Sequence, residues 1–206
     1  QLSAQSATEQ PATTNELPTL EISANANHTA TAIGTLVHRT LAQICADGIE
    51  HWSSERIDKQ IPVWRAQLQQ LSVFDDLSSA AATIQRHVSR CCAGKYGKWV
   101  LDNTYQDSQC EWPLTVKSAT GYKQYRVDRT FIDEYGTRWV VDYKSSQPAT
   151  QAGTQSKEVQ LQQFLNEQKL QYQKQMLAYG EGFRKLENRP VKLALYYPAI
   201  DYLQVL

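Results

Sequence analysis

Two aspartates and a lysine lie on two consecutive strand-like segments near the middle of the 206-residue chain. Asp128 falls within residues 126–132, and Asp142 and Lys144 fall within residues 139–144. Because side chains alternate faces along a β-strand, Asp142 and Lys144 are predicted to share one face. These residue types could bind a hard divalent cation, provided that the two aspartates meet.

The register of the predicted hairpin decides whether they meet. Its loop contains Gly136, which can take the left-handed conformation that closes a three-residue loop. If Asp133 pairs with Thr137, Asp128 lies directly across from Asp142. Facing carboxylates about 5 Å apart repel one another, and a cation between them makes the arrangement favourable. A slip of one residue would separate them, and an amphipathic hairpin with solvated charges is the alternative interpretation.

Two predicted helices carry further candidates. His38 lies at the border of an apolar stripe formed by Val37 and Leu41, where it could be a metal ligand or an ordinary interfacial histidine. Further along the chain, three residues at three- and four-residue spacing share one helix face: Tyr172, Gln175 and Tyr179. The alternative for this second group is a core stripe with a solvated glutamine at its edge.

Composition narrows the class of protein. A hydrophobic content of 41% permits a real core, and 21 basic residues balance 21 acidic residues. This neutrality argues against strong autonomous binding to nucleic acid, so a basic groove would be local. The candidates for such a groove, or for a merely solvated face, are two positions in a predicted loop and three on the helix before it: Lys95, Lys98, Arg86, His87 and Arg90.

Four cysteines occur without a paired CxxC arrangement, so a zinc ribbon is not expected: Cys45, Cys91, Cys92 and Cys110. We expect reduced, mostly buried thiols in a cytoplasmic protein. The first residues have neither a basic nor an apolar region, which predicts neither a signal peptide nor a membrane anchor. No phosphate-binding GxxxxGK[ST] motif occurs, so any ATP hydrolysis belongs to another domain.

The chain is predicted to have two parts. Residues 1–27 lack aromatic residues and contain Pro11 and Pro18, so we interpret them as a flexible linker joining a larger protein to the domain at residues 28–206. Periodicity predicts helices, three strands, a helix and a strand, which suits an α/β fold with a central mixed sheet flanked by helices. The expected helices are residues 32–50, 55–71, 77–92 and 157–186, and the expected strands are residues 109–117, 122–133, 138–145, 191–197 and 201–206.

These motifs, taken in order, resemble one known family. Residues 34–38, 127–129 and 140–146, together with the tyrosine and glutamine motif, are similar to the PD-(D/E)xK nuclease domain of the RecB and AddA type. The resemblance covers residues 32–198 and implies a restriction-endonuclease-like fold. One departure is Arg126, which replaces a common glycine and adds charge or bulk to the substrate path.

The resemblance implies a role for each candidate. His38, Asp128, Asp142 and the backbone carbonyl of Tyr143 would bind Mg²⁺ or Mn²⁺, and the imidazole favours Mn²⁺. Lys144 would orient the attacking water and stabilise charge on the phosphate. The remaining candidates would support the site and contact DNA: Tyr172, Gln175 and Tyr179. An iron–sulfur cluster is not expected, because no cysteine follows Cys110.

The implied function is that of a metal-dependent exodeoxyribonuclease in double-strand-break repair and recombination. Its expected partners are a single DNA strand or duplex end, the helicase domain of the same full-length chain and a second helicase-nuclease subunit, with no membrane. The alternative is a nuclease-fold module that has lost activity and guides DNA or docks a partner subunit.

Overall fold

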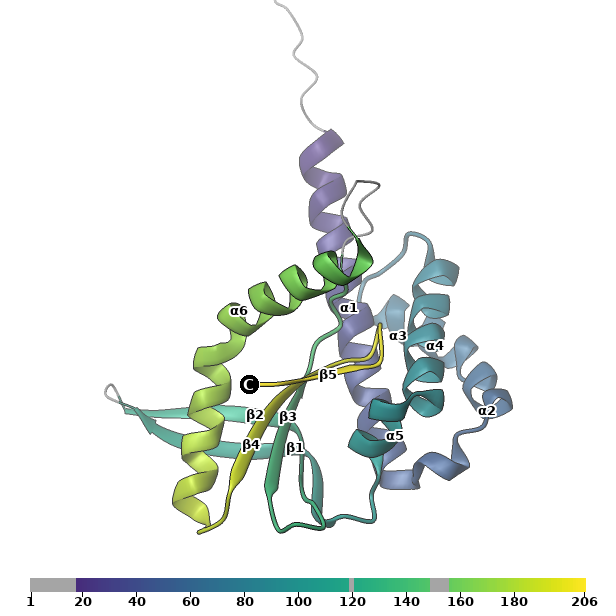
Figure 1. The fold of residues 1–206 in the computed structure, drawn as a ribbon. Coiled ribbons are helices and arrows are strands. Elements are labelled where there is room, and N and C mark those ends of the chain that lie inside the picture. Colours follow the sequence, from purple (N-terminus) through teal and green to yellow (C-terminus); the bar gives the residue numbers. More distant parts are fainter. Residues whose placement is uncertain (1–17, 119–120, 149–155) are drawn as a thin grey trace, which may run out of the picture.

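A computed structural model describes residues 18–118, 121–148 and 156–206, which build one five-stranded sheet and the helices around it (Figure 1). The elements follow in chain order: α1 (Pro18–Asp47), the 3-10 helix η1 (Ile49–His51), α2 (Ser54–Lys59), α3 (Ile61–Gln70), α4 (Leu77–Ala93), α5 (Lys95–Leu101), β1 (Gln106–Ser118), β2 (Gly121–Ile132), β3 (Arg138–Tyr143), α6 (Lys157–Leu186), β4 (Val191–Tyr197) and β5 (Tyr202–Val205).

The sheet is mixed. Its strands lie in chain order, β1-β2-β3-β4-β5, and only the β3–β4 pair is parallel. A parallel pair needs a long crossover, and α6 supplies it. Figure 1 shows α6 on one side of the sheet and α1 to α5 on the other. The predicted α/β architecture, a central mixed sheet flanked by helices, is confirmed.

Two hydrophobic clusters hold these layers together. Val141 faces the α1–α5 side with Leu41 and Ile44 of α1, whereas Val140 faces α6 with Met176. Both valines are fully buried, as a strand covered on both faces requires. β3 is therefore the central strand of the sheet, and helices pack against both of its faces.

The helical layer differs from the predicted one in two places. Residues 55–71 form two helices rather than one, and they divide at Gln60. Pro62 lies in the first turn of α3, where its missing N–H is harmless, so the proline begins a helix there instead of continuing one. Lys95 and Lys98 lie in helix α5 and not in a loop.

The proposed local basic groove is only partly present. His87 of α4 is 8% exposed, and burial together with the charges of Arg86 and Arg90 lowers its pKa to about 4. Arg90 donates a hydrogen bond to the carbonyl of Ala199. Of the five candidates only His87 is buried, and Arg90 is exposed but bonded to the backbone. Arg86, Lys95 and Lys98 are exposed.

The first helix begins earlier than the periodicity predicted. α1 starts at Pro18, a position where proline suits the first helical turn, and it extends beyond the rest of the fold (Figure 1). The expected boundary at residue 27 therefore falls inside a helix. Residues 1–17 lie outside the described residues, so the linker and the division into two parts stay predictions.

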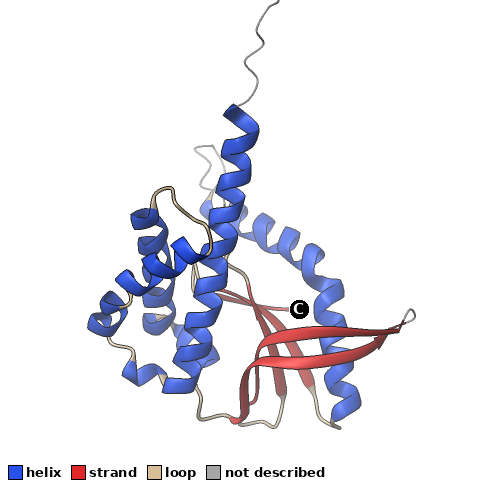
Figure 2. Cartoon of the chain, turned by 180° about the vertical axis from the view of Figure 1, so that it is seen from behind, coloured by secondary structure: helices blue, strands red, loops and turns tan. Residues whose placement is uncertain are grey.

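Strands β1 and β2 form the longest ladder of the sheet and project from it as a two-stranded ribbon (Figure 2). The outer part of β2, residues 121–124, is exposed, whereas residues 129–132 are buried. The base of this ribbon is where β2 meets β3. Asp128 lies at that point.

Candidate active site

The hairpin between β2 and β3 has the predicted register. Arg129 pairs with Val141, and the Asp133 amide donates to the Thr137 carbonyl at 3.0 Å. Gly136 closes the loop with a φ of +76°, the left-handed conformation expected of it. Continued by one residue, this register sets Asp128 opposite Asp142. The one-residue slip does not occur.

Asp128 lies where strand alternation breaks. Val127 packs in the α6-side cluster, but Arg129, two residues later, reaches helix α5 on the opposite side of the sheet. Across the ladder, Glu111 has a φ of +53°. This irregularity turns the Asp128 carboxylate toward the end of β3, where its Oδ2 accepts a hydrogen bond of 2.7 Å from the amide of Tyr143.

His38 reaches the same carboxylate from helix α1. Its Nδ1 lies 3.3 Å from Oδ1 of Asp128, and its ring meets the Tyr143 ring edge-on at 5.5 Å between centroids. The neighbouring Val37 is fully buried, so the helix is fixed against the sheet at this turn. The imidazole is therefore positioned by packing rather than by its own hydrogen bond alone.

Lys144 follows β3 directly and shares the face of Asp142, as alternation predicts. Its Nζ lies 2.5 Å from Oδ2 of Asp142 and 3.6 Å from the centre of the Tyr172 ring. The ammonium group is thus held between a carboxylate and an aromatic face. Without substrate the ammonium is ion-paired with Asp142, whereas the role implied by the resemblance requires it to lie near the attacked phosphate.

The α6 motif lies over the same point. Gln175 Nε2 is 3.4 Å from Oδ1 of Asp142 and donates to the Tyr179 hydroxyl at 2.5 Å. Tyr179 is buried and contacts Tyr125 of the ribbon edge-on. Tyr179 therefore belongs to the core, and Gln175 bridges that core to Asp142, while a contact with DNA stays a prediction.

The electrostatics of this cluster reflect crowded negative charge. Burial raises the pKa of Asp142, the charge of Asp128 raises it further, and Lys144 and His38 counteract them. Burial alone would lower the pKa of His38, but its hydrogen bond to Asp128 and the charges of both aspartates outweigh burial, so the pKa is raised. The cluster therefore favours bound positive charge.

The donor atoms suit a divalent cation. Two carboxylates and an imidazole, with a backbone carbonyl beside them, are the ligand types that Mg²⁺ and Mn²⁺ accept. Across residues 18–118, 121–148 and 156–206, however, no group of three or more His, Cys, Asp or Glu side chains stands in an arrangement that could hold a metal ion. The protein's own donors occupy the carboxylates instead, because Lys144 holds Asp142 and the Tyr143 amide holds Asp128.

The sequence did not single out Arg129, which fixes the backbone next to Asp128. Its guanidinium is fully buried and donates to the carbonyls of Val100 and Asp102 at the end of α5, at 2.8 and 2.6 Å. Unpaired carbonyls at a helix end need such donors. One sequence signal could have indicated a buried arginine: Arg129 and Phe131 lie two residues apart on a strand and so share a face.

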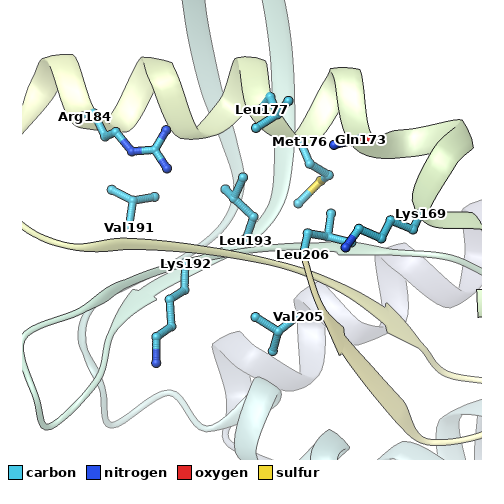
Figure 3. Close-up of a pocket in the computed structure, with 10 residues that line it drawn as sticks. All are labelled: Lys169, Gln173, Met176, Leu177, Arg184, Val191, Lys192, Leu193, Val205 and Leu206. Atoms are coloured by element: carbon cyan, nitrogen blue, oxygen red, sulfur yellow. The ribbon is translucent and has the colours of Figure 1, made fainter. Parts of the chain in front are cut away.

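A cavity of about 220 Å³ lies between α6 and the edge formed by β4 and β5, and Met176, Leu193 and Lys169 are among the residues that line it (Figure 3). None of the candidate site residues lines it. The candidate site is a charged cluster at the end of β3, apart from this cavity.

Comparison with known families agrees with this geometry. A model of the PD-(D/E)XK nuclease superfamily matches residues 14–202, and the chain belongs to that superfamily. The match bears out the restriction-endonuclease-like fold and assigns the chain to a class of nucleases that generally use divalent metals such as Mg²⁺. No curated protein sequence matches the chain. No helix in the described part of the chain is long and apolar enough to cross a membrane.

Proposed function

We propose that this domain is a metal-dependent DNA exonuclease of the RecB and AddA type, acting as the C-terminal nuclease domain of an ATP-dependent helicase-nuclease in double-strand-break repair and recombination. The observation that carries the proposal is the convergence of α1, β2, β3 and α6 on one point. His38 contacts Asp128 there, and Lys144 and Gln175 contact Asp142, each within hydrogen-bonding or ion-pairing distance.

The chain's own residues have distinct tasks in this proposal. Asp128, Asp142 and His38, with the Tyr143 carbonyl, would hold a divalent cation, which would supply Lewis acidity for water and phosphate. Lys144 leaves Asp142 for the scissile phosphate and stabilises its developing charge. Gln175 then keeps the Asp142 carboxylate oriented.

The remaining α6 residues serve the substrate and the scaffold. Tyr172, whose ring lies against the Lys144 ammonium, guides that side chain between its two positions. Tyr179 anchors Gln175 in the core. The helicase domain of the same full-length chain, and a second helicase-nuclease subunit, would deliver a single strand or a duplex end to this site.

Two observations favour a second candidate. The Lys144–Asp142 ion pair and the absence of a ready three-ligand group among the described residues would also suit an inactive nuclease-fold module. Such a module would guide DNA or dock a partner subunit without cutting.

Cleavage assays separate the two candidates. The domain is incubated with labelled single-stranded and linear duplex DNA in Mg²⁺, Mn²⁺ or EDTA, beside Asp142→Asn, which keeps the shape of Asp142 but removes its charge. We expect metal-dependent cleavage by the wild type only, and Mn²⁺ binding by calorimetry that the variant loses. A correctly folded wild type that binds DNA but never cuts it supports the inactive module.

A further inference from the structure

The β1–β2 ribbon has two unlike faces. Leu114 and Val116 are buried against α6, where Gly182 lies beside them. The residues that alternate with these two are exposed. They pair directly across the ladder: Pro113 with Arg126, Thr115 with Gln124, and Lys117 with Tyr122. This exposed face, opposite α6, ends at Arg126, two residues before Asp128 of the candidate active site.

The exposed face is basic and carries an aromatic ring. Tyr122 is 75% exposed, and Lys117 lies directly across from it. Arg126 stands nearest the site, 3.4 Å from Glu111, the sole acidic residue within residues 111–117 and 121–127. An ion pair this exposed contributes little stability, so the arginine remains available to another anion.

The geometry points to this face as the binding surface for the unpaired DNA strand next to the scissile phosphate. We call it the ribbon track and define it by Arg126, Gln124, Tyr122 and Lys117. The inference rests on the proposed function and assigns its substrate contact. It also gives a use to Arg126, which stands where a glycine is common in the resembling family.

The dimensions and the chemistry of the track fit a strand. From Tyr122 to Asp128 the chain spans about 20 Å at 3.3 Å per residue, a length over which a single strand places several phosphates. Cations along the track neutralise phosphates, and the Tyr122 ring can stack on a base. Only an unpaired base is free to stack in this way, which favours a single strand over a duplex.

Salt-dependent binding tests the charged part of the track. Anisotropy of a labelled oligothymidine strand is measured in EDTA, so that no cleavage is needed, for the wild type and for the double variant Lys117→Ala/Arg126→Ala. Loss of two phosphate contacts should lower the magnitude of the log–log salt slope by about 1.4. If the plots of log affinity against log salt concentration for the wild type and the double variant meet at 1 M, the affinity of the double variant at 0.1 M is about 25-fold lower than that of the wild type.

Two single variants identify the face and the contact type. Lys123→Ala is the matched control, because Lys123 is an exposed cation of the same ribbon that points to the α6 side, and its slope should equal that of the wild type. Tyr122→Ala should weaken binding at least about fivefold at every salt concentration without changing the slope, as lost stacking does.

The outcomes distinguish this inference from the proposed function. An unchanged slope in the double variant, an equal loss in Lys123→Ala, or no measurable strand binding at low salt overturns the ribbon track even if the wild type cleaves DNA. If the domain shows the predicted salt slopes but never cleaves DNA, the ribbon track is supported and the proposed nuclease function is refuted. If the domain binds duplex DNA as tightly as it binds a single strand, and Tyr122→Ala does not weaken that binding, the assignment to a single strand is overturned.

Discussion

Asp142 is the least exposed charge at the candidate site, with 5% of its side chain accessible against 14% for Lys144 and 27% for His38. A carboxylate with so little water around it needs a cationic partner, and breaking a buried pair is costly. Lys144 supplies that partner in the ligand-free structure. A bound divalent cation could take over the same role, which would release the lysine for catalysis.

We predict that Lys144→Ala lowers kcat about a hundredfold or more, as loss of a transition-state electrostatic partner does. The variant should also unfold at a lower temperature, because Asp142 is left unpaired. Saturating Mn²⁺ should restore the unfolding temperature, since the cation binds only the folded site. Thermal unfolding and single-turnover cleavage measure the two effects. Near-normal cleavage in saturating Mn²⁺ would show that the lysine is structural.

Helix α5 links the helical layer to the site at the scale of elements. Its amino end is held by Asp201, whose Oδ1 accepts the Gly97 amide at 2.7 Å. Its carboxyl end is held by Arg129, next to Asp128. A shift of α5 would therefore move the segment of β2 that carries Asp128. Gly97 sets how closely α5 approaches α4.

We predict that Gly97→Ala destabilises the domain by roughly 1–3 kcal/mol, the usual cost of overpacking. A Cβ at this position would lie 2.1 Å from the Cys91 carbonyl oxygen, and backbone cannot rotate away. Chemical denaturation measures the loss.

The matched control is Gly34→Ala, another helical glycine. There the closest atom is the rotatable hydroxyl of Ser145 at 2.8 Å, and alanine raises helix propensity by about 1 kcal/mol. We expect no loss of stability in this control. A Gly97→Ala variant as stable as the wild type would contradict the close packing of α5 on α4.

At the scale of the whole molecule, charge is balanced but unevenly placed. The 21 basic and 21 acidic residues cancel, so no long-range field draws DNA to the domain. Positive charge on the ribbon track is local, and the carboxylates at the end of β3 oppose it. Such a domain acts best on a strand that another domain delivers.

We predict that the isolated domain binds random duplex DNA weakly, with a dissociation constant no tighter than about 10⁻⁶ M at physiological salt. Few phosphates can be neutralised at once, so few counterions are released. Fluorescence anisotropy with duplex of mixed sequence measures this affinity. Nanomolar binding at physiological salt would refute the inference from neutrality.

The sequence by itself determined the features that depend on neighbouring residues. The β2–β3 register followed from Gly136 and the short loop around it, because turn geometry and side-chain alternation act over a few residues. The long helix at residues 157–186 and the strand after it followed from apolar patterning. Each of these needed only local rules.

Tertiary structure alone decided the features that join distant parts of the chain. His38 meets Asp128 across 90 residues, and Gln175 meets Asp142 across 33, so both contacts depend on how helices pack on the sheet. The sequence did not predict helix α5, because Gly97 lowers helix propensity. A glycine stands at this position because α5 packs closely against α4. The Lys144–Asp142 pair likewise arose from burial, since a charge removed from water takes the nearest partner that packing provides.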